Sequence, residues 1–374
     1  MNTWLSALAY WIVDVYAMAT VVLVAALIAL GSIRQPARRL AVARWTLLVL
    51  LCVPMLAVLT KSTGGAGAVP DPELADLAEL CYCNVPGATP SGRVTALVTI
   101  FATCSGLVVT WLALGALATA RLVVRSAEAP ASLQTLLKQV VTDGPTSPRL
   151  RVGGVSQPVA LGLFRPTILL PDWFVETETK AGVEAALTHE WAHLRRGDLW
   201  TLATSRLLFV VLFAHPLFYV LRGRLRAAQE VIADAEAAGP SGKVAYAEAL
   251  VGWARRASRR SFGSSLTLLG RSSLLRKRVA LLLDAEFRVE QGCPRAWMVA
   301  VRAAAVALVI GLSVLASTGM ARAALSAVVP VNPPVVPHTH PSDAKALVCP
   351  PASVPPWWPG CCRPRDLGGD ASAK

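Results

Sequence analysis

Two histidines and a glutamate form the most chemically specific pattern in the chain. ThrHisGluTrpAlaHisLeu occupies residues 188–194, so His189 and His193 stand four residues apart. On a helix this spacing places both imidazoles on one face, where they can bind one Zn²⁺ at about 2.0–2.1 Å. Glu190 can then act as the general base on a water that the metal activates. The alternative is a solvated helix face with an incidental ion pair.

A third ligand is expected from GlnGluValIleAlaAsp at 229–234. Glu230 is the natural carboxylate ligand, and Glu236 competes for the role. Asp234 lies one helical turn after Glu230 and can hydrogen-bond a ligating histidine, which fixes its tautomer. Two histidines and one carboxylate leave a position open for water, as in catalytic zinc sites. The pattern therefore predicts one catalytic Zn²⁺ per chain.

The element that carries the histidines is predicted to be a helix from about Thr179 to Arg196. Its composition favours a helix. Gly197 is suited to the position after the helix, and Arg195 and Arg196 place cations at the negative end of the helix dipole. A polar stretch from about Ser126 to Thr142 is also predicted to be helical.

Three short strands are predicted between these helices, because apolar and β-branched runs alternate there with Gly and Pro. They cover 149–155, 158–162 and 167–170, and the last two are expected to form a hairpin with its turn near 164–166. We expect the substrate to add as an extended strand to a sheet edge beside the zinc helix. The residues expected at that edge are Thr167, Ile168, Leu169 and Leu170.

Four apolar stretches indicate a membrane protein. The chain has 374 residues, of which 54% are hydrophobic and only 16% charged, with a mean hydropathy of +0.52. A spanning helix needs about 20 apolar residues, and a large buried core, the alternative, rarely contains four such runs. The expected spans are Trp4–Leu30, Ala41–Leu59, Val94–Ala120 and Ala303–Ala321, with Arg302 at the edge of the last.

Charge asymmetry predicts the orientation of these spans. Segment 31–44 carries four arginines and no acid, segment 60–93 has two basic and four acidic residues, and segment 121–296 has 24 basic and 15 acidic residues. Positive loops stay in the cytoplasm, so we expect 31–44 and 121–296 inside a bacterial-type cytoplasmic membrane and both termini outside. The net charge of +13 is then mainly a topology signal.

Basic runs at 255–260 and 276–278 leave DNA binding as an alternative. They are explained more simply by contact with anionic lipid, so no direct nucleic-acid partner is expected.

Residues 199–222 are too short to cross the membrane, because the uncharged part, Leu207–Leu221, has 15 residues. A crossing would also place His193 and Glu230 on opposite sides, where they could not share a metal. We expect a helix that is buried in the protein or dips into the inner leaflet. His215 within it is expected to be a packing or loop residue and not a fourth ligand.

The predicted organisation is a three-span membrane region (1–120), a cytoplasmic zinc metallopeptidase domain (121–296), a fourth transmembrane helix (297–321) and a Pro-rich tail (322–374), expected to be disordered.

Outside the membrane, cysteines can persist as disulfides. Five fall on the predicted outer side, namely Cys81, Cys83, Cys349, Cys361 and Cys362, whereas Cys293 lies near the inner face.

Several of these segments together resemble the membrane metallopeptidases of the β-lactam sensor-transducers (BlaR/MecR type). The similar segments are ArgProThrIleLeuLeuPro at 165–171, HisGluTrpAlaHisLeuArgArgGlyAsp at 189–198, PheAlaHisProLeuPhe at 213–218, GluValIleAlaAsp at 230–234 and LeuArgLysArgValAlaLeuLeuLeu at 275–283. Their order and the flanking spans match the family layout over roughly residues 1–321.

The resemblance implies a mostly α membrane protein whose cytoplasmic α+β domain is a gluzincin-like zinc peptidase. It implies that His189, His193 and Glu230 bind zinc, that Glu190 is the base, and that the protein cleaves itself or a transcriptional repressor after an outer signal. A non-catalytic receptor or scaffold that kept the fold is the alternative.

Two features depart from the family. Only about 53 residues follow the fourth span, too few for the outer penicillin-binding domain, so β-lactam sensing is not expected. HisPro at 215–216 replaces the AsnPro frequent in the family.

Overall fold

The computed structural model describes residues 3–63, 92–141, 147–260, 265–284 and 286–317. Met1–Leu325 form one compact unit, and the second unit, Ser326–Lys374, lies outside the described residues. The Pro-rich tail and the five cysteines predicted on the outer side therefore also lie outside them.

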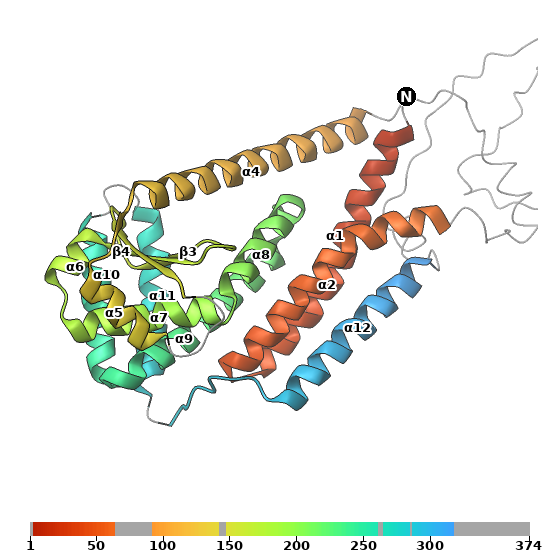
Figure 1. Cartoon of the computed structure of the whole chain (residues 1–374). Coiled ribbons are helices and arrows are strands. Elements are labelled where there is room, and N and C mark those ends of the chain that lie inside the picture. Colours follow the sequence, from red (N-terminus) through yellow and green to blue (C-terminus); the bar gives the residue numbers. More distant parts are fainter. Residues whose placement is uncertain (1–2, 64–91, 142–146, 261–264, 285, 318–374) are drawn as a thin grey trace, which may run out of the picture. The chain divides into compact units, whose positions relative to one another are not determined.

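Among the residues that the structure describes, four helices are long and apolar enough to cross a membrane, as the sequence predicted. They are α1 (Thr3–Ser32), α2 (Pro36–Thr63), α4 (Gly92–Arg125) and α12 (Arg295–Ser317), and α2 packs on both α1 and α12 (Figure 1).

The fourth of these helices begins eight residues earlier than predicted, at Arg295 instead of Ala303. Arg302 therefore lies inside α12 and not at its edge. Its guanidinium lies 5.7 Å from the centroid of the Trp45 ring on α2, and this cation–π contact offsets part of the cost of placing a charge within the helix.

A small sheet lies beside the helices in the order β1-β2-β4-β3. β2 pairs in parallel with β4, β3 pairs antiparallel with β4, and β1 pairs antiparallel with β2. The three predicted strands are all present, and β1, in the stretch predicted as helix, was not predicted. The strands are β1 (Ala127–Glu128), β2 (Arg149–Gly153), β3 (Val159–Leu161) and β4 (Thr167–Pro171).

The predicted hairpin joins β3 and β4, and Gly162 makes its turn possible. Gly162 has a φ of +85°, and a Cβ at this position would lie 2.3 Å from the Arg165 carbonyl oxygen. Only glycine fits such a turn without strain.

The sheet and five surrounding helices share one hydrophobic core, to which Ala237 and Ala238 of a sixth helix, α9 (Pro216–Ser241), also belong. Strand β4 is buried along its whole length, and its side chains pack with those of the helix that carries the histidines, α7. The surrounding helices are α5 (Ala131–Val140), α6 (Asp172–Thr177), α7 (Lys180–Arg195), α10 (Lys243–Arg260) and α11 (Ser265–Leu283).

Residues 199–222 form parts of two helices, where the sequence predicted one. Helix α8 (Asp198–Leu212) and helix α9 (Pro216–Ser241) are joined by a turn at 213–215, and Pro216 occupies the first turn of α9. We call α8 and α9 together the α8–α9 hairpin. The chain turns back at His215, so no single helix runs through residues 199–222, and the expectation that this segment does not cross the membrane stays a prediction.

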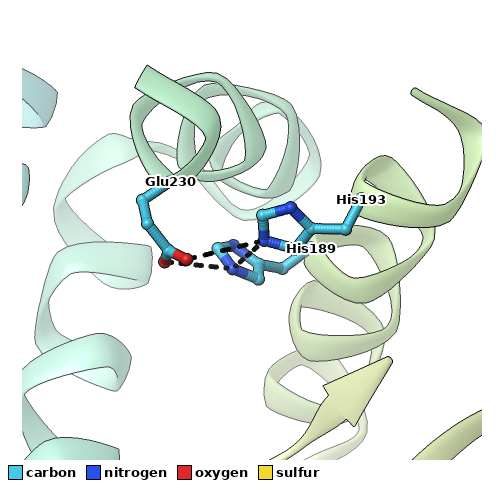
Figure 2. A group of neighbouring side chains, drawn as sticks. All are labelled: His189, His193 and Glu230. Atoms are coloured by element: carbon cyan, nitrogen blue, oxygen red, sulfur yellow. Dashed lines mark hydrogen bonds and ion pairs between the residues drawn. The ribbon is translucent and has the colours of Figure 1, made fainter. Parts of the chain in front are cut away.

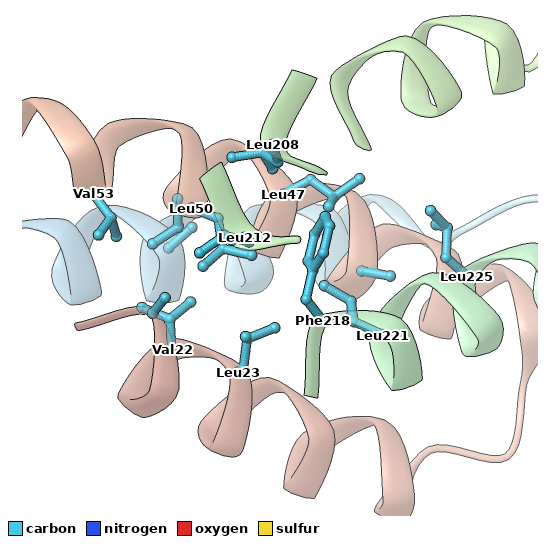
Figure 3. Packing of buried hydrophobic residues seen from close by; sticks show 14 of the residues in the cluster. Val22, Leu23, Leu47, Leu50, Val53, Leu208, Leu212, Phe218, Leu221 and Leu225 are labelled. Atoms are coloured by element: carbon cyan, nitrogen blue, oxygen red, sulfur yellow. The ribbon is translucent and has the colours of Figure 1, made fainter. Parts of the chain in front are cut away.

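The hairpin packs into the core of the spanning helices (Figure 3). The Tyr16 hydroxyl on α1 donates to the Val211 carbonyl at 3.0 Å, and the Ser105 hydroxyl on α4 donates to the Val210 carbonyl at 3.1 Å. The shared core includes Val22, Leu23, Leu47, Leu50, Val53, Leu208, Leu212, Phe218, Leu221 and Leu225.

Candidate metal centre

The histidine helix α7 begins and ends where the sequence predicts. The Thr179 side chain caps its N-terminus by accepting a hydrogen bond from the Gly182 amide at 3.1 Å. Gly197 follows its C-terminus with a φ of 69°, a left-handed conformation that suits glycine. The chain reverses at this glycine and enters α8.

His189 and His193 point their Nε2 atoms at one another from successive turns of α7 (Figure 2). These two atoms are 3.2 Å apart. The carboxylate of Glu230, on the neighbouring helix α9, faces both rings. Its oxygens lie 3.8 Å from His189 Nε2 and 3.9 Å from His193 Nε2. The structure therefore brings together the three predicted ligands, whose donor atoms all lie within 4.8 Å of one another.

Glu236, the competing ligand, is held elsewhere. It accepts hydrogen bonds from Arg195 at 2.8 Å and from Arg196 at 2.7 Å. Both arginines are in the last turn of α7 or just after it, so these ion pairs fasten α9 to the end of the histidine helix. The geometry therefore favours Glu230 over Glu236.

A carboxylate holds the Nδ1 atom of each histidine. His189 Nδ1 lies 3.2 Å from Asp234 Oδ1, as predicted, and His193 Nδ1 lies 2.6 Å from Asp198 Oδ2. A carboxylate acceptor keeps the proton on Nδ1 and leaves the Nε2 lone pair free for a metal. Both rings are thus oriented so that each neutral imidazole could bind a metal through Nε2.

Asp198 is a site residue that the sequence analysis missed. It comes directly after the left-handed Gly197, and the reversal of the chain there returns its side chain to His193. Its Oδ1 atom accepts from Arg44 on α2 at 2.6 Å and from Gln229 on α9 at 3.0 Å. The sequence signal was the GlyAsp pair at 197–198 within the segment that resembles the family, but only Gly197 was interpreted, as the residue after the helix.

The charges around His193 favour its protonated form in the metal-free site. Burial alone would lower the pKa of His193, but the hydrogen bond to Asp198 and the charges of Glu190 and Glu230 raise it. Burial would likewise raise the pKa of Asp198, but His193, Arg196 and Arg44 lower it. A divalent cation would take the place of this proton, because an imidazole binds a metal only in its neutral form.

Asp234 is the centre of a second buried network. The Tyr246 hydroxyl donates to its Oδ1 at 2.9 Å and also lies 3.1 Å from His189 Nδ1. Arg278 on α11 binds both carboxylate oxygens at 2.6 Å and reaches Glu230 Oε2 at 2.9 Å. Burial would raise the pKa of Asp234, but Arg278 and His189 hold it far below its usual range.

Tyr246 and Arg278 were not predicted as site residues. Burial and the Asp234 charge raise the pKa of Tyr246 well above its usual value. The hydroxyl therefore stays protonated and can act as a hydrogen-bond donor. The run at 275–283 did carry a signal, because it resembles a family segment, but nothing in its spacing pointed to Asp234.

Glu190 is buried on α7. Its charge is close enough to His193 to raise the pKa of that imidazole. Its role as general base stays a prediction.

The prediction that Thr167, Ile168, Leu169 and Leu170 form a sheet edge is wrong. Strand β4 is paired on both sides, with β2 and with β3, and its residues are buried. The hairpin pairs β3 with one edge of β4, and β2 pairs in parallel with the other edge, so β4 has no free edge. The edge strand that contacts α7 is β3, Val159–Leu161.

His215 lies away from this centre, as predicted. Its ring stacks on Tyr16 with centroids 5.6 Å apart, and its Nε2 atom lies 3.1 Å from the Thr20 hydroxyl. It therefore packs the tip of the α8–α9 hairpin against α1.

The donor set fits Zn²⁺, which binds imidazole nitrogen and carboxylate oxygen. A family model described as BlaR1 peptidase M56 matches residues 74–282. No curated protein matches the chain.

Proposed function

The chain belongs to the BlaR1 peptidase M56 family, and on this basis we propose that it is a membrane-embedded zinc endopeptidase in signal transduction. Its substrate is a protein, either the chain itself or a transcriptional repressor. The observation that carries the proposal is the convergence of His189, His193 and Glu230, with each imidazole held through Nδ1 by a buried carboxylate.

The residues of this chain divide the work of hydrolysis. His189, His193 and Glu230 would hold the zinc, and a fourth position stays open because no other ligating side chain among the described residues joins the group. When bound, Zn²⁺ supplies a Lewis acid that lowers the pKa of water towards about 7. Glu190 accepts a proton from the attacking water and delivers it to the leaving amine. Asp234 and Asp198 hold the two imidazole rings in the orientation that directs Nε2 towards the metal position.

Strand β3 is the element that would receive the substrate. As an edge strand it has unpaired backbone groups on one side, and an extended peptide can add to them. Val159–Leu161 contact α7, so a peptide added there would run past the histidine helix.

We place segment 121–296 on the cytoplasmic side, because it carries 24 basic against 15 acidic residues. A cytoplasmic repressor would then be within reach of the site.

The test compares wild type with Glu190→Gln in membranes at equal zinc content. Glutamine keeps the size of glutamate but cannot accept the proton, so zinc should stay bound while cleavage falls by about 10²–10⁴-fold. Glu184→Gln, on the same helix six residues earlier, is the matched control and should cleave as wild type does. The readout is self-cleavage or cleavage of a candidate repressor, followed by immunoblotting.

Equal cleavage by wild type and Glu190→Gln would refute Glu190 as the base. Loss of cleavage in Glu184→Gln as well would assign the effect to the fold of α7. Zinc bound without any cleavage, under every outer stimulus applied, would favour the non-catalytic receptor.

A further inference from the structure

The α8–α9 hairpin carries positive charge at the level of the spanning helices. Its tip packs on Tyr16, as described above. Further along α9, Arg224 Nη1 donates to the Leu27 carbonyl at 3.2 Å. Leu27 lies five residues before Ser32, where the first candidate span ends. The first half of α9 therefore lies beside the last turns of that candidate span, which would approach the bilayer surface there.

Three arginines around this level have no acidic partner. Arg222 and Arg226 lie one turn apart on α9, and both Arg226 and Arg206 of α8 are near enough to Arg222 to repel its charge. Arg206 and Arg226 are exposed, and Arg222 is half-buried. Within the described part of the chain, no carboxylate forms an ion pair with any of the three. Their mutual repulsion is therefore uncompensated by the protein.

Two aromatic rings position the central arginine. The Arg222 guanidinium lies 4.9 Å from the centroid of the Phe209 ring on α8 and 5.8 Å from that of Phe218 on α9. A guanidinium next to ring faces still has N–H groups directed outward in its own plane. Those groups match the oxygens of a phosphate, which arginine can bind in a bidentate manner.

An apolar groove shares Phe209 with this cluster. It is shallow and largely open to the outside, has a volume of about 340 Å³ and is lined by Leu107, Val108 and Trp111 of α4 together with Phe209. The lining is almost entirely apolar, and the groove lies between two helices at membrane level. It suits a hydrocarbon chain that lies alongside the protein.

We propose that Arg206, Arg222 and Arg226 bind the headgroup of an anionic phospholipid, one of whose acyl chains lies in the groove of Leu107, Val108, Trp111 and Phe209. The charge cluster lacks a counter-ion, the bilayer surface offers phosphate at the same level, and the groove continues from the cluster through Phe209. A free phosphate ion would satisfy the arginines but would leave the groove unused. The site is separate from the candidate metal centre and does not depend on its activity.

The experiment titrates the full-length, detergent-purified protein with phosphatidylglycerol and follows binding by native mass spectrometry. Phosphatidylcholine with the same acyl chains and inorganic phosphate form the other two arms. The variant R206Q/R222Q/R226Q removes the cluster, and R149Q/R165Q/R288Q removes three other exposed arginines as a matched control. We expect phosphatidylglycerol to bind the first variant about 100-fold more weakly, and the control to bind as wild type does.

Three outcomes would overturn the proposal. These are equal phosphatidylglycerol binding by the two triple variants, equal binding of phosphatidylcholine and phosphatidylglycerol by wild type, or displacement of the lipid by an equal concentration of inorganic phosphate.

A second variant, R206K/R222K/R226K, keeps all three charges and so keeps the folding of the hairpin. It lacks the planar guanidinium, and we expect it to bind phosphatidylglycerol about 10-fold more weakly. Unchanged affinity in this variant would also count against the site.

Discussion

Arg44 on the spanning helix α2 lies 2.6 Å from Asp198 Oδ1, and the other oxygen of the same carboxylate lies 2.6 Å from His193 Nδ1. One buried aspartate thus joins a membrane helix to a predicted zinc ligand. Arg44 also donates to the Arg196 carbonyl at 2.7 Å, so it holds the turn between α7 and α8 as well.

Replacing Asp198 by Asn should weaken zinc binding and change its pH dependence. At pH 8 the zinc affinity should fall by about 10–100-fold. A neutral amide at Nδ1 makes the imidazole a weaker electron-pair donor to the metal than a carboxylate does. The aspartate charge raises the pKa of His193, so without it a proton competes with the metal only at lower pH. The pH below which the zinc affinity starts to fall should therefore decrease. Competition with a fluorescent chelator across pH 5–8 measures both effects, and Asp172→Asn, at an exposed site, is the control.

Purified wild-type protein should contain about one zinc per chain. His189→Ala and His193→Ala should each lose it, because two remaining ligands do not hold the metal. His215→Ala changes a histidine of the same chain that packs on Tyr16, and it should keep its zinc. Metal analysis after gel filtration decides this. Full zinc retention in the double variant at 189 and 193 would show that the site is elsewhere.

Much of this site follows from spacing within a single helix. The pair His189 and His193, and the pair Glu230 and Asp234, are each four residues apart, so helix geometry alone places each pair on one face. Asp198, Tyr246, Arg278 and Arg44 could not be found in this way, because they reach the site from other elements. Their contacts depend on how α2, α8, α10 and α11 pack.

The same distinction applies to the fold. Hydropathy predicted the four spanning helices, and turn residues predicted the β3–β4 hairpin. The order of the strands depends on the parallel pairing of β2 with β4, a contact between distant segments that no local pattern encodes. For that reason the edge strand was assigned wrongly.

Asp234 should make the metal-free protein sensitive to acid. Its pKa is far lower in the folded protein than the value of about 3.9 in an unfolded chain. Below about pH 5 the unfolded state takes up more protons, so the stability that Asp234 contributes at neutral pH is lost as the pH falls. Asp234→Asn should be less stable at pH 7, because Arg278 loses the more buried of its two carboxylate partners, and its melting temperature should vary less between pH 5 and 3. Thermal unfolding in detergent tests this, with the exposed Glu248→Gln as control.

Labelling of single cysteines tests the orientation of the chain. The charge asymmetry predicts Cys293 inside and Cys361 outside, so a membrane-impermeant maleimide should label only one of them in intact cells. Labelling of both from the same side would contradict the assigned number of crossings.

The α8–α9 hairpin starts beside His193, packs its middle part against α1, α2 and α4, and returns to supply Glu230. The peptidase segment therefore cannot be separated from the bilayer at residues 121 and 296. An excised fragment would carry Leu208, Leu212, Phe218 and Leu221 without the helices that cover them, and would lack Arg44. We expect such a fragment to aggregate in aqueous buffer. Protease assays on this protein therefore need the complete membrane region. Inhibitors found with a soluble fragment would have been selected against a site that lacks its native packing.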